Sequence, residues 1–89
     1  MFQVLYSPGA AKALKKIPKE DAKRIVKAID TLSEVDDPGR YVKKLKGTFG
    51  VPLYSFRVGD YRVILSVCEE ALAVYVIDVG DRNIVYRNY

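Results

Sequence analysis

Histidine is absent from this sequence, and cysteine occurs once, as Cys68. One cysteine cannot form an internal disulfide, and without histidine beside it a zinc site lacks its usual ligands. Cys68 lies in a pattern typical of a strand, where we expect a small buried apolar residue. The sequence thus predicts a protein of the reducing cytoplasm that binds no metal and uses no cofactor.

Long apolar runs are missing as well. No segment is apolar enough over a sufficient length to cross a membrane, and the first residues lack the basic flank and cleavage site of a signal peptide. We also find no internal repeat and no low-complexity segment. The 89 residues are therefore expected to form a single domain, residues 1–89, with no membrane partner.

Basic residues outnumber acidic ones, with a formal net charge of +4 and a sequence pI of about 9.2. Apolar residues make up 49% of the chain, which is enough for one core. A basic domain favours an acidic partner, and nucleic acid, the ribosome and an acidic protein all qualify. The charge alone does not choose among them, because many domains are mildly basic.

The first half of the chain has helical periodicity. After a predicted strand over residues 2–6, Ser7 followed by Pro8 is a typical helix start. Pro18 separates this helix from a second one, which has acidic residues in its first turn. Each helix carries one apolar stripe, and almost nothing joins them. They are expected to form a helical hairpin that packs on a flat surface.

In the second half the apolar period changes to two. Alternation over residues 53–58, 61–68 and 72–77 predicts strands joined by short turns, which must therefore be antiparallel. Before them, the basic segment 41–47 is a candidate edge strand. We expect a two-layer α+β fold with an N-terminal strand, a helical hairpin and a mainly antiparallel meander of three to four strands.

The segment 53–62, LYSFRVGDYR, predicts a tight β-hairpin. Gly59 and Asp60 form its two-residue loop, and glycine in first place suits a type II′ turn, which needs a positive φ there. Pairing outward from this loop sets Arg57 directly opposite Arg62 on the sheet face away from the helices. Like charges facing across a strand pair are destabilising, so we expect an anion between them.

Arginines are good candidates to hold a phosphodiester, because guanidinium groups bind phosphate oxygens bidentately and stay charged at cellular pH. Arg57, Arg62 and Arg82 are therefore expected to stabilise a phosphate and its developing charge. Tyr86 follows as a residue that stacks on bases or moves protons. Simpler interpretations stay open: Arg57 as a solubilising residue, Arg82 as half of a surface ion pair, and Tyr86 as an anchor of the tail.

Three lysines precede the hairpin and are better placed for contacts to an RNA backbone than the lysines of the helices, which most simply form a solvated face. The candidate RNA-binding set comprises Lys43, Lys44, Lys46, Ser55 and Tyr89.

The order strand, helical hairpin, KKLKG, LYSFRVGDYRV and VIDVGDRNIVY resembles the RelE/ParE superfamily of bacterial and archaeal toxins over nearly the whole chain. The KLKG segment, the RVGDYRV hairpin and the VY end are fairly specific for the superfamily and less specific for the branch. Resemblance to the RelE branch implies a ribosome-dependent mRNA endonuclease. Such an enzyme enters the A site and cuts mRNA, independently of metal, by attack of a ribose 2′-OH on the next phosphate.

By position, the resemblance implies catalytic roles for Arg57, Arg62, Arg82 and Tyr86. Well-known bacterial members carry a second basic residue at the place held here by Ser55, which leaves the identity of the general base open. A tyrosine with its ordinary pKa of about 10 is a poor base unless neighbouring arginines depress that pKa.

The resemblance also implies partners: a RelB-like antitoxin with acidic, foldable segments, the ribosome and mRNA. Two alternatives stay open. One is a ParE-like inhibitor of DNA gyrase, a protein-binding toxin without catalysis. The other is a degenerate member that only binds its antitoxin.

Overall fold

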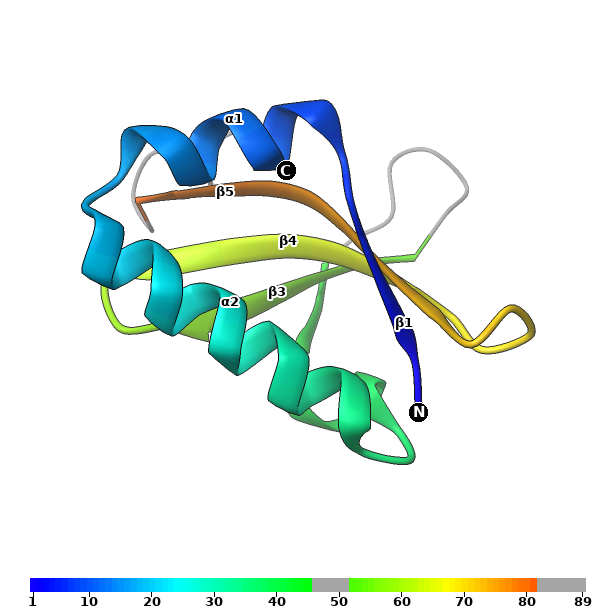
Figure 1. Ribbon diagram of the computed structural model, residues 1–89. Helices are drawn as coiled ribbons and strands as arrows, with labels where there is room; N and C mark the ends of the chain where they lie inside the picture. The colour runs from blue at the N-terminus through cyan, green and yellow to red at the C-terminus, as the bar shows by residue number, and fades with distance from the viewer. Residues whose placement is uncertain (46–51, 82–89) are drawn as a thin grey trace.

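Two helices pack on one face of a five-stranded sheet in the computed structural model, which describes residues 1–45 and 52–81 (Figure 1). In chain order the elements are β1 (Gln3–Tyr6), α1 (Pro8–Lys16), α2 (Lys19–Glu34), the 3₁₀ helix η1 (Pro38–Tyr41), β2 (Lys43–Leu45), β3 (Leu53–Val58), β4 (Tyr61–Cys68) and β5 (Ala73–Asp81).

The strands lie side by side in the order β1-β5-β4-β3-β2. Strands β2 to β5 form an antiparallel meander, whereas β1 pairs in parallel with β5 at the far edge. The expected two-layer α+β fold is confirmed, including the edge strand in the basic segment. None of the helices in the described part of the chain is long and apolar enough to cross a membrane.

Helix α1 begins as the sequence predicts. Pro8 occupies the first turn, and the Ser7 hydroxyl accepts a hydrogen bond of 3.0 Å from the backbone N–H of Ala10. The same hydroxyl donates a hydrogen bond of 2.6 Å to the carbonyl of Ile77. Ser7 therefore caps the helix and also ties its start to β5. Figure 1 shows α1 lying along β5.

Helix α2 starts directly after Pro18, with Glu20 and Asp21 in its first turn, as expected. Its apolar stripe faces the sheet: Ile25 and Ile29 have no exposed surface. Burying such a side chain is worth about 2 kcal/mol, so this stripe fixes the helix on the sheet. The core between the two layers contains Phe2, Ala10, Ile25, Ile29, Leu32, Val58, Val63, Leu65, Val74, Val76 and Val79.

The β3–β4 hairpin has the predicted register. Arg57 pairs with Arg62 and Val58 pairs with Tyr61. Gly59 has φ of 59°, which fits the first position of the expected type II′ turn.

Strand β5 is longer than the alternation over residues 72–77 predicts, since it continues to Asp81. A register shift explains the difference: Leu65 of β4 pairs with Val76, and the preceding residue, Ile64, pairs with Asp78. The extra residue on β5 is a bulge. Beyond it the strand continues, and Val79 points back into the core.

The alternation over residues 72–77 predicts Leu72 on the core face, with Val74 and Val76, and this prediction is wrong. Leu72 is 51% exposed and has φ of 49° in the turn before β5. Its N–H donates to the carbonyl of Glu69 at 3.2 Å, and its carbonyl accepts from the N–H of Gln3 at 2.7 Å. The backbone bonds of the turn and of β1 thus decide its position, rather than its apolar side chain.

Candidate functional site

The paired arginines lie on the sheet face opposite the helices. Arg57 and Arg62 are cross-strand partners in the middle of the sheet, on β3 and β4. Their chain neighbours Phe56 and Tyr61 alternate to the other face and pack against the core. Two permanent positive charges therefore project side by side from the face that no helix of the described chain covers.

The two guanidinium groups turn to different partners. Arg57 is exposed, and its Nε donates to the carbonyl of Gly59 at 3.2 Å, toward the turn. Arg62 is partly buried and donates from a terminal nitrogen to the hydroxyl of Ser55 at 2.9 Å, away from the turn. The two side chains thus point toward opposite ends of the hairpin. The anion expected between them stays a prediction.

Ser55 is 2% exposed, and its hydroxyl is occupied by Arg62. This geometry favours a role in orienting Arg62 over the direct RNA contact expected from the sequence. Lys43 pairs with Ser55 across β2 and β3 and so shares the arginine face, whereas Lys44 pairs with Tyr54 on the helix side. Of these two lysines, only Lys43 adds a positive charge to the arginine face.

A second apolar cluster, which was not predicted from the sequence, lies beside the arginines. Leu45, Leu53 and Ile64 are buried on the arginine face, and Ile77 packs against them. The signal was available, because Leu53 and Ile64 alternate in phase with the arginines. Apolar surroundings lower the local dielectric, so the adjacent charges act more strongly on an anion than they would in bulk water.

Four predicted site residues, Lys46, Arg82, Tyr86 and Tyr89, lie outside the described residues. The structure therefore brings together Arg57 and Arg62, with Ser55 and Lys43 next to them. The proposed roles of the other four stay predictions.

Tyr61, next to Arg62 in sequence, belongs to a separate network on the helix side. Its hydroxyl donates to Asp21 at 3.1 Å, and the other carboxylate oxygen of Asp21 forms an ion pair with Arg24 at 2.7 Å. Burial raises the pKa of Tyr61, as do the hydrogen bond to Asp21 and the neighbouring carboxylates. Tyr61 is therefore a poor general base, and its contacts connect the hairpin to the start of α2.

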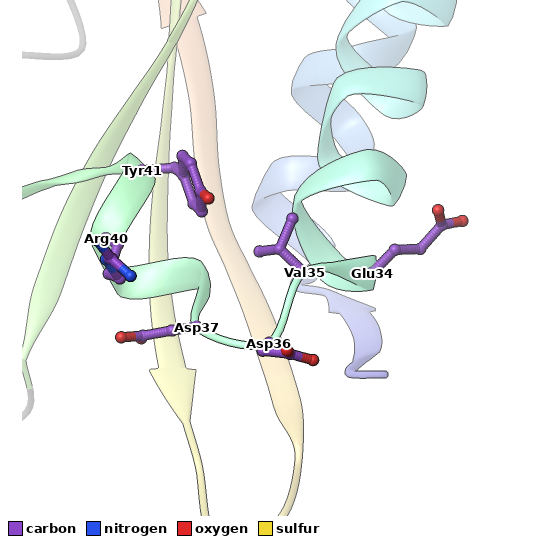
Figure 2. Close-up of a pocket in the computed structure, with 6 residues that line it drawn as sticks. All are labelled: Glu34, Val35, Asp36, Asp37, Arg40 and Tyr41. Carbon is purple, nitrogen blue, oxygen red and sulfur yellow. The ribbon is translucent and has the colours of Figure 1, made fainter.

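A pocket lies between the end of α2 and η1 (Figure 2). In Figure 2 the side chains of Glu34, Asp36 and Asp37 point in different directions, while Val35 and Tyr41 face each other across the gap. No group of three or more potential metal ligands occurs among the residues that the structure describes. Arg40 also lines the pocket, so its charge is mixed, with three carboxylates and one guanidinium group.

Comparison with known proteins identifies the family of this chain. Residues 4–86 match the family model described as the ParE toxin of the type II toxin–antitoxin system parDE. No match was found among curated proteins.

Several solved structures share the fold. In the archaeal RelE–RelB complex from Pyrococcus horikoshii OT3, the matching chain is 32% identical with a TM-score of 0.75, and the match covers 93% of this chain and 97% of that one. In the toxin–antitoxin complex RelBE2 from Mycobacterium tuberculosis the identity is 27% and the TM-score 0.78, with 91% and 98% covered. In the RelB–RelE complex from Methanococcus jannaschii the identity is 25% and the TM-score 0.70, with 96% and 98% covered.

The family model carries the ParE name and the similar structures are RelE complexes, and the two toxins belong to one superfamily. From the match over residues 4–86 and the 32% identity to the archaeal chain, this protein belongs to the RelE/ParE superfamily of type II toxins, on its RelE-like branch.

Proposed function

We propose that this toxin is a ribosome-dependent endonuclease that cuts mRNA in the A site. The observation that carries the proposal is the register pair Arg57–Arg62 on the sheet face opposite the helices, with Lys43 on the same face beside Ser55. A surface built only to bind a protein does not need two guanidinium groups on one rung. A phosphodiester backbone, by contrast, is bound well by such a pair.

In the proposed reaction, a ribose 2′-oxygen attacks the adjacent phosphorus and the bond to the 5′-oxygen of the next nucleotide breaks. The 2′-hydroxyl loses its proton to a base, and the leaving 5′-oxygen gains one. The products are a 2′,3′-cyclic phosphate and a 5′-hydroxyl. Negative charge grows on the phosphate oxygens in the transition state, where fixed cations stabilise it most.

Within this scheme the two described arginines have different roles. Arg62 is held by Ser55 and acts as a preorganised donor, whereas exposed Arg57 is free to move from the Gly59 carbonyl to a phosphate oxygen. Arg82 is proposed as a third phosphate ligand and Tyr86 as the residue that orients the base or nucleophile. Loss of one preorganised donor typically costs about 3 kcal/mol in the transition state, or roughly a hundredfold in rate.

The proposed partners are the ribosome, mRNA and a RelB-like antitoxin. The antitoxin is inferred from the similar structures, which are of RelE–RelB and RelB–RelE complexes. Its binding is expected to neutralise or displace the arginine site.

A cell-free translation extract tests the proposal. The parent protein is expected to stop translation and to produce new mRNA 5′ ends within the A-site codon, and Arg57→Ala, Arg62→Ala and Arg82→Ala are each expected to slow the cleavage. Lys12→Ala, on the exposed side of α1, is the matched loss of one positive charge and should leave cleavage unchanged. Equal cleavage by the parent and by Arg82→Ala would show that Arg82 has no role in the reaction.

A second candidate function is inhibition of DNA gyrase by protein binding, and the match to the ParE family model favours it. A supercoiling assay run beside the translation assay separates the two. Loss of supercoiling with intact mRNA would support the gyrase inhibitor, and the arginine variants would then behave like the parent.

A further inference from the structure

An exposed aromatic ring shares the sheet face of Arg57 and Arg62. Tyr75 of β5 is 43% exposed and pairs with Ser66 of β4. Ser66 follows Arg62 by four residues on the same strand, so the two side chains lie on the same face of the sheet. Tyr75 therefore belongs to the face that carries the arginines, opposite the helices.

The core of the protein does not account for this ring. Its neighbours along β5, Val74 and Val76, are on the helix side and have no exposed surface. Among the aromatic residues within 1–45 and 52–81, only Tyr41 and Tyr75 are exposed. Ser66 beside the ring is buried, so the ring, and not this serine, meets any molecule that binds here.

The second apolar cluster separates the ring from the arginines. Ile64 lies between Arg62 and Ser66 on β4, and Ile77, which packs against Ile64, comes two residues after Tyr75 on β5. At about 3.3 Å per residue, the distance along β4 from Arg62 to Ser66 is about 13 Å. Along this face, then, a pair of cations is followed by an apolar surface and then by an aromatic ring.

This succession matches the chemistry of a single RNA strand. The backbone carries a negative charge at every phosphate, while an unpaired base exposes two flat apolar faces. Proteins that hold single strands combine cationic groups for the backbone with aromatic rings on which bases stack, and sheets often present those rings. A distance of about 13 Å spans a few nucleotides, since stacked bases rise by about 3.4 Å each.

We propose that Tyr75 is a stacking site for one unpaired base of the RNA whose phosphate lies at Arg57 and Arg62. This proposal rests on the proposed function and adds a base site to it. Every base has a flat face, so the site tolerates any sequence. Its role is to fix the strand along the sheet, and with it the phosphate that reaches the arginines.

The position of the ring favours RNA over a protein partner. Single exposed aromatic residues are common on protein surfaces, and exposure alone would fit a protein contact equally well. Tyr75, however, shares its face with two guanidinium groups in register, in a chain of net charge +4. The combination of fixed cations and an exposed ring suits a polyanion that also carries aromatic bases.

A fluorescent RNA strand tests the site directly. The probe is an oligouridylate of about 12 nucleotides with one central 2-aminopurine, a base analogue whose fluorescence falls when it stacks on a ring. Uridine stacks weakly, so the purine is the preferred occupant of the site. The strand carries 2′-O-methyl groups throughout, which prevent attack by a 2′-oxygen. Binding is measured at low salt with the free protein.

The variants separate the aromatic ring from apolar bulk. Tyr75→Phe keeps the ring, whereas Tyr75→Leu and Tyr75→Val keep an apolar side chain without it, and valine also favours a strand. Tyr41→Leu is the matched control, since Tyr41 is an exposed tyrosine that lies against α2, on the helix side. Circular dichroism and thermal unfolding establish that each variant is folded.

We expect the parent, Tyr75→Phe and Tyr41→Leu to bind the probe equally and to quench it. Tyr75→Leu and Tyr75→Val should bind about tenfold more weakly and lose most of the quenching, because stacking on one ring is worth about that much. No quenching by the parent would overturn the proposal. So would equal binding and quenching by the parent and by the folded leucine or valine variant.

Salt dependence distinguishes stacking from charge. The logarithm of the binding constant falls linearly with the logarithm of the salt concentration, and each phosphate contact on a single strand contributes about 0.7 to the slope. Arg57→Ala should lower the slope by about this amount. Tyr75→Leu should keep the slope of the parent, because stacking releases no counterion, and a lower slope for this variant would contradict stacking.

Cleavage on ribosomes separates this proposal from the proposed function. If the parent quenches the probe through Tyr75 but cuts no mRNA, the proposed function fails and the base site stands. If the parent cuts mRNA while Tyr75→Leu binds and quenches the probe like the parent, the base site fails and the proposed function stands.

Discussion

Arg57 and Arg62 face each other in register across β3 and β4, yet one donates to the Gly59 carbonyl and the other to the Ser55 hydroxyl. The chain itself thus turns the two like charges of one rung toward opposite ends of the hairpin. A phosphate that arrives between them meets donors whose positions are already partly fixed. Preorganisation of this kind is the feature that makes fixed cations effective in a transition state.

Ser55→Ala tests whether Ser55 orients Arg62. Loss of one hydrogen bond to a charged group is expected to cost about 1–2 kcal/mol of stability and to slow mRNA cleavage about tenfold, because Arg62 loses its anchor. Ser66→Ala is the control. Like Ser55, Ser66 is a buried serine, but it is on β4 and lies opposite Tyr75. Equal cleavage by the two variants in single-turnover assays would show that Ser55 has only a packing role.

Ser7→Ala is expected to lower the free energy of unfolding by about 1–2 kcal/mol. The substitution removes both the cap on the Ala10 N–H and the donor to the Ile77 carbonyl. Denaturant unfolding measures the loss, and Ser7→Thr, which keeps a hydroxyl, should recover most of it. If the alanine and threonine variants are equally stable, the hydroxyl does not link α1 to β5.

Gly59→Ala is expected to destabilise the protein by about 1–2 kcal/mol, because a side chain at φ of 59° is strained. Space is not the cause, since the nearest atoms to an added Cβ would be those of Arg24 at 3.8 Å. Asp60→Ala, at the other loop position, should change stability by less. Equal losses at both positions would contradict the assigned turn.

Tyr6 makes the stability of the protein depend on pH in the alkaline range. Burial, and to a smaller extent the negative charge of Asp30, raises the pKa of Tyr6 above 10.0. An unfolded chain then loses this proton before the folded one does, so the stabilisation is complete below pH 10.0 and declines as pH rises toward the higher folded pKa. Tyr6→Phe should remove this contribution to the alkaline loss of stability.

At neutral pH the same Tyr6→Phe variant should be more stable by up to about 1 kcal/mol. The Tyr6 hydroxyl is buried without a hydrogen-bond partner in the part of the chain that the structure describes. Unfolding curves at neutral and alkaline pH measure both effects. A less stable variant at neutral pH would show that the hydroxyl makes a favourable contact.

Local signals in the sequence predicted much of this fold. Ser7 with Pro8 marks a helix start through the chemistry of the first turn, and Gly59 with Asp60 fixes the hairpin register through the turn type. Such features depend on residues that are close in the chain. Their prediction therefore requires no knowledge of tertiary contacts.

Features that depend on distant segments were missed. The bulge in β5 beside Ile77 and the exposed position of Leu72 follow from pairing with β4 and β1, which no local pattern encodes. The divergence of the two arginines was missed for the same reason. It depends on the contact of Arg62 with Ser55, a residue on the neighbouring strand.

The most direct test of the central claim is the single-turnover cleavage of mRNA in the A site of programmed ribosomes. The account predicts that the parent cuts normal mRNA and fails to cut mRNA with a 2′-deoxyribose at the scissile position, and that Arg62→Ala cuts normal mRNA roughly a hundredfold more slowly than the parent. Cleavage of the deoxy substrate, or an unchanged rate for the double variant Arg57→Ala with Arg62→Ala, would contradict it.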